Sequence, residues 1–393
     1  MDKNSQADKP GNRTHSDSSN RFDMMEWAGA FGDLSTLIPF VAGYVGILKM
    51  DPTGILFAFG AVMVIFGVYY KTPIPVQPMK AIGAIAITQA AHAAVITPIT
   101  VVSASLATGA IWLLVGVTGA ANWIDSLVPR SVATGIVLGL GISFMIQGAE
   151  MMVHQWVIAT IGFLGTLPIV TSRRYPAMFL LLLFGGIYSI FINPELVHQL
   201  ISHSIEIHAP VFVLQDISWS NFLTGFVFLS IPQLPLTLGN AVVAIRDENN
   251  RLFPQRPVTD KVLTISTGLM NIFGSIVGGV PMCHGAGGMA GHVVFGARTG
   301  GSIIILGTIL LLLSLFFSGS IDLLLHLFPA GILGVMLFFS GAQLASGSFK
   351  CNRYKIDHII IFMTAAFSLW NIGLAFIIGI VGAHLVKRGK LKL

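Results

Sequence analysis

Long apolar runs separated by short polar segments repeat along almost the whole chain. A helix needs about 20 apolar residues to cross a bilayer, and most of the runs approach that length. The first half predicts spans at residues 26–48, 53–70, 74–94, 100–120, 130–150, 153–171 and 176–192. The second half predicts spans at residues 218–245, 258–278, 281–297, 300–318, 325–346, 356–371 and 372–387. The pattern therefore predicts an all-α polytopic membrane protein with about 14 transmembrane segments.

Polar segments divide the chain into two halves with a tail at each end. Residues 1–21 are polar and lack an apolar run, which is typical of a disordered tail, and residues 388–393 form a short second tail. Seven spans fall in residues 22–192 and seven in residues 218–387, with an extracytoplasmic loop at residues 193–217 between them. We expect both tails on the cytoplasmic side.

The charge distribution supports this topology. Hydrophobic residues make up 54% of the chain and charged residues 10%, whereas a soluble domain has about 25% charged residues. Of the 22 Lys and Arg residues, only Lys49 falls outside and only Lys80 lies within a span, as the positive-inside rule requires. The formal charge of +5 therefore reflects topology, and no nucleic-acid partner is expected. The lipid bilayer of a plasma membrane or a bacterial inner membrane is the expected location.

The two halves resemble each other, which indicates a duplicated unit. Prolines recur at matching places, and the pairs Pro39 and Pro235, Pro78 and Pro281, and Pro129 and Pro329 are separated by 196, 203 and 200 residues. Since each copy has an odd number of spans, the copies must have opposite topology. This predicts a 7+7 inverted-repeat transporter fold.

Two spans are broken by proline at matching places, in PIPVQPMKAIGAIAI (residues 73–87) and GGVPMCHGAGGMAGH (residues 278–292). They predict two half-helices whose N-termini meet near the membrane midplane. Such ends present unpaired N–H groups and the positive end of the helix dipole, which suits a small anion. Gly285, Gly287 and Gly288 would let the backbone approach a ligand closely. Tight helix packing is the alternative explanation for these glycines.

Candidate substrate-binding side chains lie on the broken elements and on the first and eighth spans. Lys80 is a charge inside a span, which costs about 3 kcal/mol unless an anion or an ion pair with Asp33 offsets it. Gln77, Gln233 and Asn240 could orient an oxyanion, and His284 could donate to it or carry a proton. The full candidate set is Asp33, Thr36, Gln77, Met79, Lys80, Ala81, Gln233, Asn240, Cys283, His284, Gly285, Ala286, Gly287 and Gly288.

Two further features suggest less specific chemistry. Glu150 near the outer end of the fifth span is the candidate for coupling transport to protons, although an interfacial, solvated carboxylate is the alternative. Cys283 beside His284 suggests a metal, but two ligands without a partner cluster make a poor zinc site. We therefore expect neither a metal nor a cofactor.

These motifs resemble the molybdate transporter family, which is related to the SulP-type (sulfate permease) anion transporters. The resemblance rests on GDLSTLIPF (32–40), PVQPMKAIGAIA (75–86), QLPLTLGNAVVA (233–244), LFPQRP (252–257), GLMNIFG (268–274) and PMCHGAGGMAGHVVFGARTGGS (281–302). It implies a seven-plus-seven inverted fold with a core domain that carries the site and a gate domain beside it. It also implies uptake of molybdate, a tetrahedral dianion, with Gln77, Lys80 and residues 284–288 inside the family's motifs.

The sequence thus predicts a secondary active transporter that moves molybdate by alternating access. A sulfate or general oxyanion transporter is the nearest alternative, followed by an anion channel and a nucleobase carrier. An enzyme is not expected, since no HExxH motif, nucleophile elbow or paired carboxylates within one span occur in the sequence. A proton as the coupling ion and a second copy of the chain in a homodimer are candidate partners.

Overall fold

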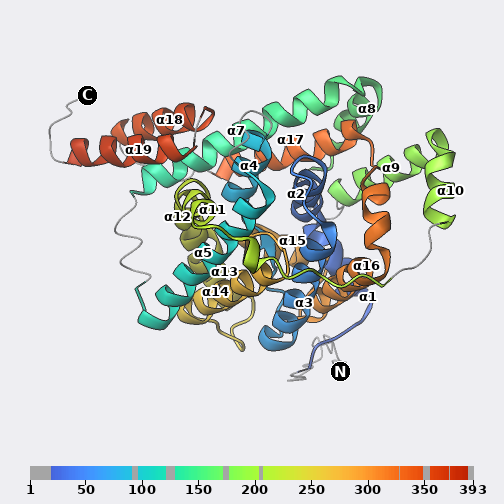
Figure 1. Cartoon of the computed structure of the whole chain (residues 1–393), viewed down its shortest axis with the longest axis horizontal. Helices are drawn as coiled ribbons and strands as arrows, with labels where there is room; N and C mark the ends of the chain where they lie inside the picture. Colours follow the sequence, from blue (N-terminus) through green and yellow to red (C-terminus); the bar gives the residue numbers. More distant parts are fainter. Residues whose placement is uncertain are drawn as a thin grey trace, which may run out of the picture.

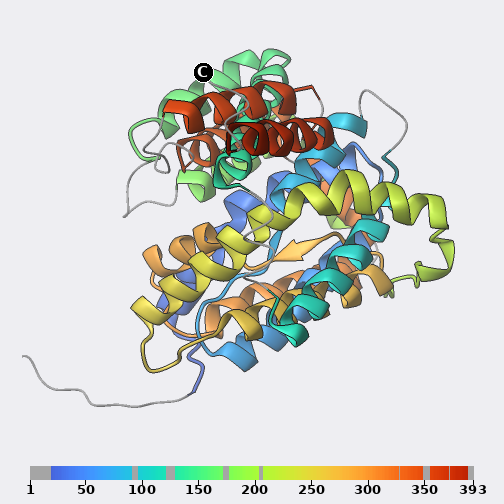
Figure 2. The same cartoon turned by 90° about the vertical axis from the view of Figure 1, so that its left-hand side faces the viewer.

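The computed structural model describes residues 19–90, 96–120, 129–170, 177–202, 207–326, 328–347, 355–370 and 372–387. The chain is mostly helical, and its elements fall into two groups (Figures 1 and 2). One group lies on one side of the molecule and contains α7 (Arg130–Val153), α8 (Trp156–Thr166), α9 (Ala177–Ile192), α17 (Ala330–Gly347), α18 (Lys355–Ser368) and α19 (Ile372–Lys387). The other contains the remaining long helices and, in its middle, two short paired strands.

The first half of the chain contains one broken helix, two long helices, one strand followed by a short helix, and a further set of three helices. Their bounds are α1 (Met24–Ala30), η1 (Phe31–Asp33), α2 (Leu34–Gly46), α3 (Pro52–Tyr70), β1 (Gln77–Pro78), α4 (Lys80–Ala90), α5 (Pro98–Thr118), α7 (Arg130–Val153), α8 (Trp156–Thr166) and α9 (Ala177–Ile192). Asp51 and Thr97 cap α3 and α5, and each is followed by proline at the first helical position, where its missing N–H costs nothing.

The second half repeats this order. Its elements are α10 (Pro194–Ser202), η2 (Leu214–Asp216), α11 (Trp219–Thr224), η3 (Gly225–Ser230), α12 (Ile231–Leu236), η4 (Thr237–Val243), α13 (Ala244–Leu252), α14 (Asp260–Ile276), β2 (Met282–Cys283), α15 (Ala286–Val294), α16 (Gly301–His326), α17 (Ala330–Gly347), α18 (Lys355–Ser368) and α19 (Ile372–Lys387). The continuous segment from α11 to α13 contains two π-helical stretches, η3 and η4, on either side of Pro232 and Pro235.

Several predicted boundaries differ from the structure. The interval 193–217, which we expected to be a loop, contains the helix α10. The span predicted at 218–245 continues to Leu252, and the one at 300–318 continues to His326 across a kink at Phe317. Residues 1–18 of the predicted tail and residues 388–393 lie outside the described residues.

The length of the helices tests the span count only in part. Within the described residues, five helices are long and apolar enough to cross a membrane. A sixth candidate is the pair that runs from Met24 to Gly46, which bends by 48° around η1. Other predicted spans correspond to shorter apolar helices, so the number 14 stays a prediction.

The long helices pair across the two halves of the chain. Helix α3 packs along α16, α5 along α14, and α7 along α17. Glycines bring the backbones together, since a Cβ at Gly60 would meet the Gly307 carbonyl at 2.8 Å and one at Gly148 would meet the Gly334 carbonyl at 2.6 Å. If the two halves are exchanged, the α3–α16 pair maps onto α14–α5, and the α7–α17 pair maps onto itself. This is the arrangement expected of two copies related by a twofold axis.

Candidate functional site

The two proline-broken elements meet as a two-stranded antiparallel ladder. Gln77 lies opposite Cys283, Pro78 lies opposite Met282, and the Met79 amide donates to the Pro281 carbonyl at 2.8 Å. The strands are two residues long, because helices begin at Lys80 and Ala286 directly after them. This ladder brings the N-termini of α4 and α15 side by side in the middle of the molecule.

Asn271 on α14 holds the second strand in place. Its side chain donates to the Met282 carbonyl at 2.7 Å and accepts from the Met282 amide at 2.8 Å, so it replaces a neighbouring strand. Ser105 on α5 in turn donates to the Asn271 carbonyl at 3.0 Å. Our sequence analysis missed this residue, although it lies in the GLMNIFG motif. A polar residue within an apolar span was the available signal.

Gln233 caps the N-terminus of α4. Its Oε1 accepts from the amides of Ala81 at 2.8 Å and Ile82 at 3.3 Å, while its Nε2 donates to Thr237 at 2.9 Å. Gln233 and Ala81 are buried. We expected these α4 amides to be open to a ligand and Gln233 to orient it. In the structure both amides donate to the side-chain oxygen of Gln233 instead.

The N-terminus of α15 is different, because within the described residues no side chain caps it. Gly285 is the N-cap, and its carbonyl accepts from Gly288 and Met289. Gly287 is exposed and Ala286 is half-buried, so this helix end can be reached from outside. A Cβ placed on Gly287 would have no heavy atom nearer than Lys80 Nζ, at 4.0 Å. The glycine therefore leaves a space between the Lys80 ammonium and the end of α15.

Lys80 is half-buried, and no hydrogen bond or ion pair joins its ammonium to any of the described residues. The ion pair with Asp33 that we considered is therefore not formed within 4 Å, although the two charges lie near enough to interact. The Lys80 side chain carries a positive charge at a helix N-terminus, where the dipole disfavours it. An anion in the space beside Gly287 would offset this cost.

Asp33, Thr36 and Gln77 form a polar cluster behind the ladder. Gln77 Nε2 makes a short hydrogen bond to Asp33 Oδ1 and a longer one, 3.3 Å, to Thr36 Oγ1. The cluster explains two of the glycines, since a Cβ on Gly285 would overlap Gln77 Oε1 and one on Gly288 would lie 2.7 Å from Asp33 Oδ2. Gly285 and Gly288 thus make room for these side chains, whereas Gly287 does not.

His284 does not face the space beside Lys80. Its Nδ1 lies 2.9 Å from the Pro75 carbonyl and its Nε2 lies 2.8 Å from Ser266 Oγ, which also accepts from Tyr70 at 2.6 Å. The ring is fully buried against Phe66 and Tyr70. Both nitrogens are therefore used within the protein, and His284 ties the start of α15 to α14, α3 and the segment before β1. Our expectation that it donates to an anion has no geometric support.

The remaining candidates are more dispersed. Met79 and Cys283 are buried. Asn240 is half-buried in η4, and no described contact joins it to Lys80 or Gln77. Glu150 is exposed near the end of α7, and among the described residues nothing connects it with the strand ladder. No group of three metal-ligating side chains occurs within the described residues.

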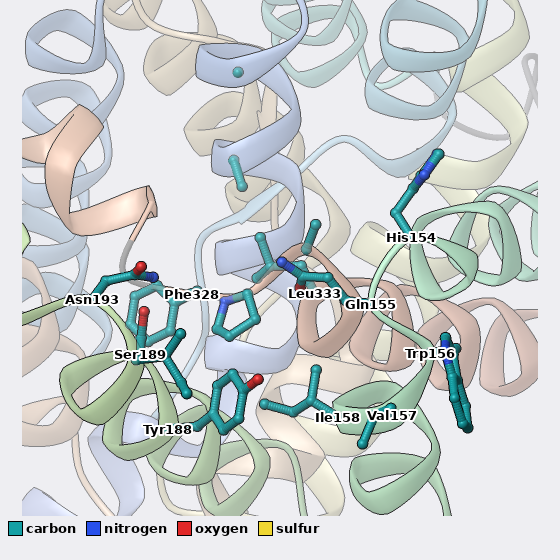
Figure 3. Close-up of a pocket in the computed structure, with 15 residues that line it drawn as sticks. His154, Gln155, Trp156, Val157, Ile158, Tyr188, Ser189, Asn193, Phe328 and Leu333 are labelled. Carbon is teal, nitrogen blue, oxygen red and sulfur yellow. The ribbon is translucent and has the colours of Figure 1, made fainter.

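A separate cavity of about 600 Å³ lies between the two helix groups, at the C-terminal end of α2 (Figure 3). The junction of α7 with α8, the end of α9 and the start of α17 complete its walls. Its polar lining includes His154, Gln155, Tyr188, Ser189 and Asn193, and none of the candidate site residues. Gln155 Oε1 accepts from the Gly331 amide at 2.9 Å, which links α7 to α17.

Comparison with known proteins shows the family. The family model described as "Molybdate transporter of MFS superfamily" matches residues 25–144 and 225–344, which together are more than half of the chain. The chain belongs to the molybdate transporter family. The prediction from the motifs is confirmed, and the family is one of transporters and not of enzymes. The two matched stretches have equal length and begin at residues 25 and 225, close to the offset between the paired prolines.

Members of the family align over most of this chain. Molybdate transporter 2 of Arabidopsis thaliana is 30% identical over 413 residues, which cover 92% of this chain and 87% of the relative. Molybdate transporter 1 of the same plant is also 30% identical, and molybdate transporter 1 of Chlamydomonas reinhardtii is 26% identical.

Solved structures show the same fold at low sequence identity. The anion transporter SLC26A9 superimposes with a TM-score of 0.67 at 11% identity, covering 94% of this chain and 66% of that one. The transmembrane domain of the cyanobacterial bicarbonate transporter BicA superimposes with a TM-score of 0.58 at 14% identity, covering 90% of this chain and 97% of that one. The fold thus resembles that of the SLC26 transporters, a 7+7 inverted repeat.

Proposed function

We propose that this chain is a secondary active transporter that carries molybdate across its membrane by alternating access. The anion would bind between the Lys80 ammonium and the uncapped N-terminus of α15. The observation that carries the proposal is the unpaired Lys80, 4.0 Å from the position of a Cβ on the exposed Gly287. The names of the 30%-identical relatives support molybdate as the substrate.

The charges beside Lys80 suit a dianion. Lys80 supplies one positive charge, and each helix N-terminus contributes about half a positive charge. Together these balance the two negative charges of molybdate. Because Gln233 occupies the amides of α4, that helix contributes its dipole and its lysine, whereas α15 contributes backbone N–H donors.

The arrangement of the helices supports alternating access. The strand ladder and both short helices belong to one helix group, and α7, α8, α9, α17, α18 and α19 form the other. A movement of one group past the other would change the side from which the anion is reached while the site stays intact. We place both chain ends on the cytoplasmic side of a plasma membrane or a bacterial inner membrane, in line with the Lys and Arg distribution.

The experiment that tests this function is uptake of labelled molybdate into liposomes that contain the purified protein. We expect saturable uptake that excess sulfate disturbs only weakly. Equal competition by sulfate would make the protein a general oxyanion transporter, since Lys80 and backbone amides recognise charge and shape alike. Unsaturable conduction that follows voltage would indicate an anion channel and contradict the proposal.

A further inference from the structure

The first broken helix carries two buried carboxylates that are stabilised very differently. Glu26 is completely buried, and its Oε1 accepts from the amides of Arg298 and Thr299 at 2.9 Å each. Its Oε2 accepts from the Ser302 amide at 3.1 Å, and the Arg21 guanidinium lies 3.7 Å away. Three backbone donors and a cation stabilise a negative charge on Glu26.

Asp33 has weaker support for a negative charge. It is 3% exposed, and the side chain that donates to its carboxylate is the neutral amide of Gln77, which also contacts Thr36. Lys80 is not close enough for an ion pair. A buried carboxylate is costly unless it is paired and fully hydrogen-bonded, and a bound proton removes that cost.

The Gln77 amide connects Asp33 to the end of α15. Its Nε2 faces Asp33, while its Oε1 is buried against Gly285 and has no hydrogen-bond partner among the described residues. A half-turn of the terminal amide exchanges oxygen and nitrogen within nearly the same space. In the turned state a protonated Asp33 would donate to Oε1, and the Gln77 N–H groups would point to the start of α15.

We propose that Asp33, acting through Gln77, takes up one proton with each anion bound at the end of α15. This inference rests on the proposed function and names its coupling ion. With Asp33 ionised, the Gln77 oxygen is buried against Gly285, and its partial negative charge at the start of α15 opposes an anion there. With Asp33 protonated, Gln77 presents donors instead. The charge balance agrees. Lys80 and the two helix ends neutralise a dianion, so no positive charge remains to balance an ionised Asp33.

Among the described ionisable groups around Asp33, Asp33 itself is the one placed to take up this proton. Lys80 on α4 and Cys283 on β2 interact with its charge. On α15, His292 is buried and its Nδ1 is engaged with the Gly29 carbonyl. On α1, Glu26 points to the start of α16 and is fully hydrogen-bonded there. Glu150, which the sequence suggested for coupling, is exposed at the far end of α7.

The test measures proton uptake and molybdate affinity on the same purified protein, over a pH range in which molybdate stays a dianion. Calorimetry in buffers of different ionisation enthalpy gives the number of protons taken up for each anion. We expect about one proton for the wild type, with an affinity that rises by up to about tenfold for each unit by which the pH falls.

Three variants locate the proton. Asp33→Asn, which donates to Gln77 at any pH, should take up no proton and bind molybdate at alkaline pH as tightly as the wild type does in acid. Gln77→Leu should weaken binding and reduce its pH dependence, because the carboxyl then has no amide to turn. Glu150→Gln is the matched control and should keep the wild-type pH profile.

Several results would overturn the inference while the transport function survives. These are saturable molybdate binding without proton uptake, an unchanged pH profile in Asp33→Asn, or a profile flattened by Glu150→Gln alone. A folded Asp33→Asn that no longer binds would show that the anion needs the ionised carboxylate, which also contradicts it. If the wild type binds no molybdate at any pH, the proposed function itself fails and the inference with it. The number of protons that the wild type takes up for each anion tests the inference even if Asp33→Asn does not fold.

Discussion

Helices α4 and α15 start from the same strand ladder, at matching places in the two halves, yet their N-termini are occupied differently. A side chain from α12, Gln233, holds two amides of α4. No described side chain accepts from the first amides of α15. This helix begins at Ala286 with three small residues, Ala286, Gly287 and Gly288. Duplication supplies a symmetric scaffold, whereas a substrate with a single centre needs only one open helix end. In the proposed site the two copies therefore contribute differently, with Lys80 from α4 and open backbone donors from α15.

Removal of the Lys80 cation on α4 should weaken molybdate binding the most. Lys80→Ala should reduce molybdate affinity about ten- to hundredfold, because hydrogen bonds to charged groups contribute about 1.5–3 kcal/mol. Saturable uptake by liposomes measures it. Lys261→Ala, which removes an exposed cation from α14, is the control. Uptake kinetics that stay unchanged in Lys80→Ala would remove this lysine from the site.

The second prediction fills the space at the end of α15. Gly287→Val should lower molybdate affinity by about tenfold or more while the protein keeps its thermal stability, since a Cβ there meets nothing closer than 4.0 Å. Gly285→Ala is the counterpart, because its Cβ would overlap Gln77 Oε1. The main effect of Gly285→Ala should therefore be a lower thermal stability. Normal binding by Gly287→Val would favour a packing role for this glycine.

The third prediction concerns the cap of α4. Gln233→Leu leaves two buried amides without an acceptor, which costs about 1–3 kcal/mol of stability. It should lower the thermal unfolding temperature but change molybdate affinity less than Lys80→Ala does. If Gln233→Leu abolished binding in a folded protein, Gln233 would contact the anion and the division between the two helix ends would be wrong.

The smallest effect on stability and affinity is expected at Thr237, one helical turn after Gln233. Thr237→Val removes the acceptor for Gln233 Nε2 and should cost about 1 kcal/mol of stability, with near-normal affinity. Thermal unfolding with and without molybdate separates the two quantities. An affinity loss larger than that of Gln233→Leu would place Thr237 itself near the anion.

The sequence predicted the framework of the site because its signals are local. Prolines that break apolar runs identified both short helices, and the recurrence of those prolines indicated the duplication. The motifs indicated the family, which the family model and the relatives then showed. Bounds within irregular segments were less certain, as the helix α10 inside a predicted loop illustrates.

Long-range hydrogen bonds were beyond sequence reasoning. The Gln233 cap joins residues 152 positions apart, and the bond from His284 to Pro75 spans 209 positions. Such pairs depend on how helices pack, which no local pattern encodes. The three neighbouring glycines show the same limit. Position alone could not separate Gly285 and Gly288, which accommodate Gln77 and Asp33, from Gly287, which leaves open space.

The pairing of α3 with α16 and of α5 with α14 has a consequence for how the protein is made. Helix α3 ends at Tyr70, and its partner begins at Gly301. At about 5–20 residues per second, a ribosome needs on the order of tens of seconds to synthesise the chain between them. Throughout that time the glycine-lined face of α3 must contact lipid or the insertion machinery. A nascent first half is therefore vulnerable to quality control until translation of the second half is nearly finished.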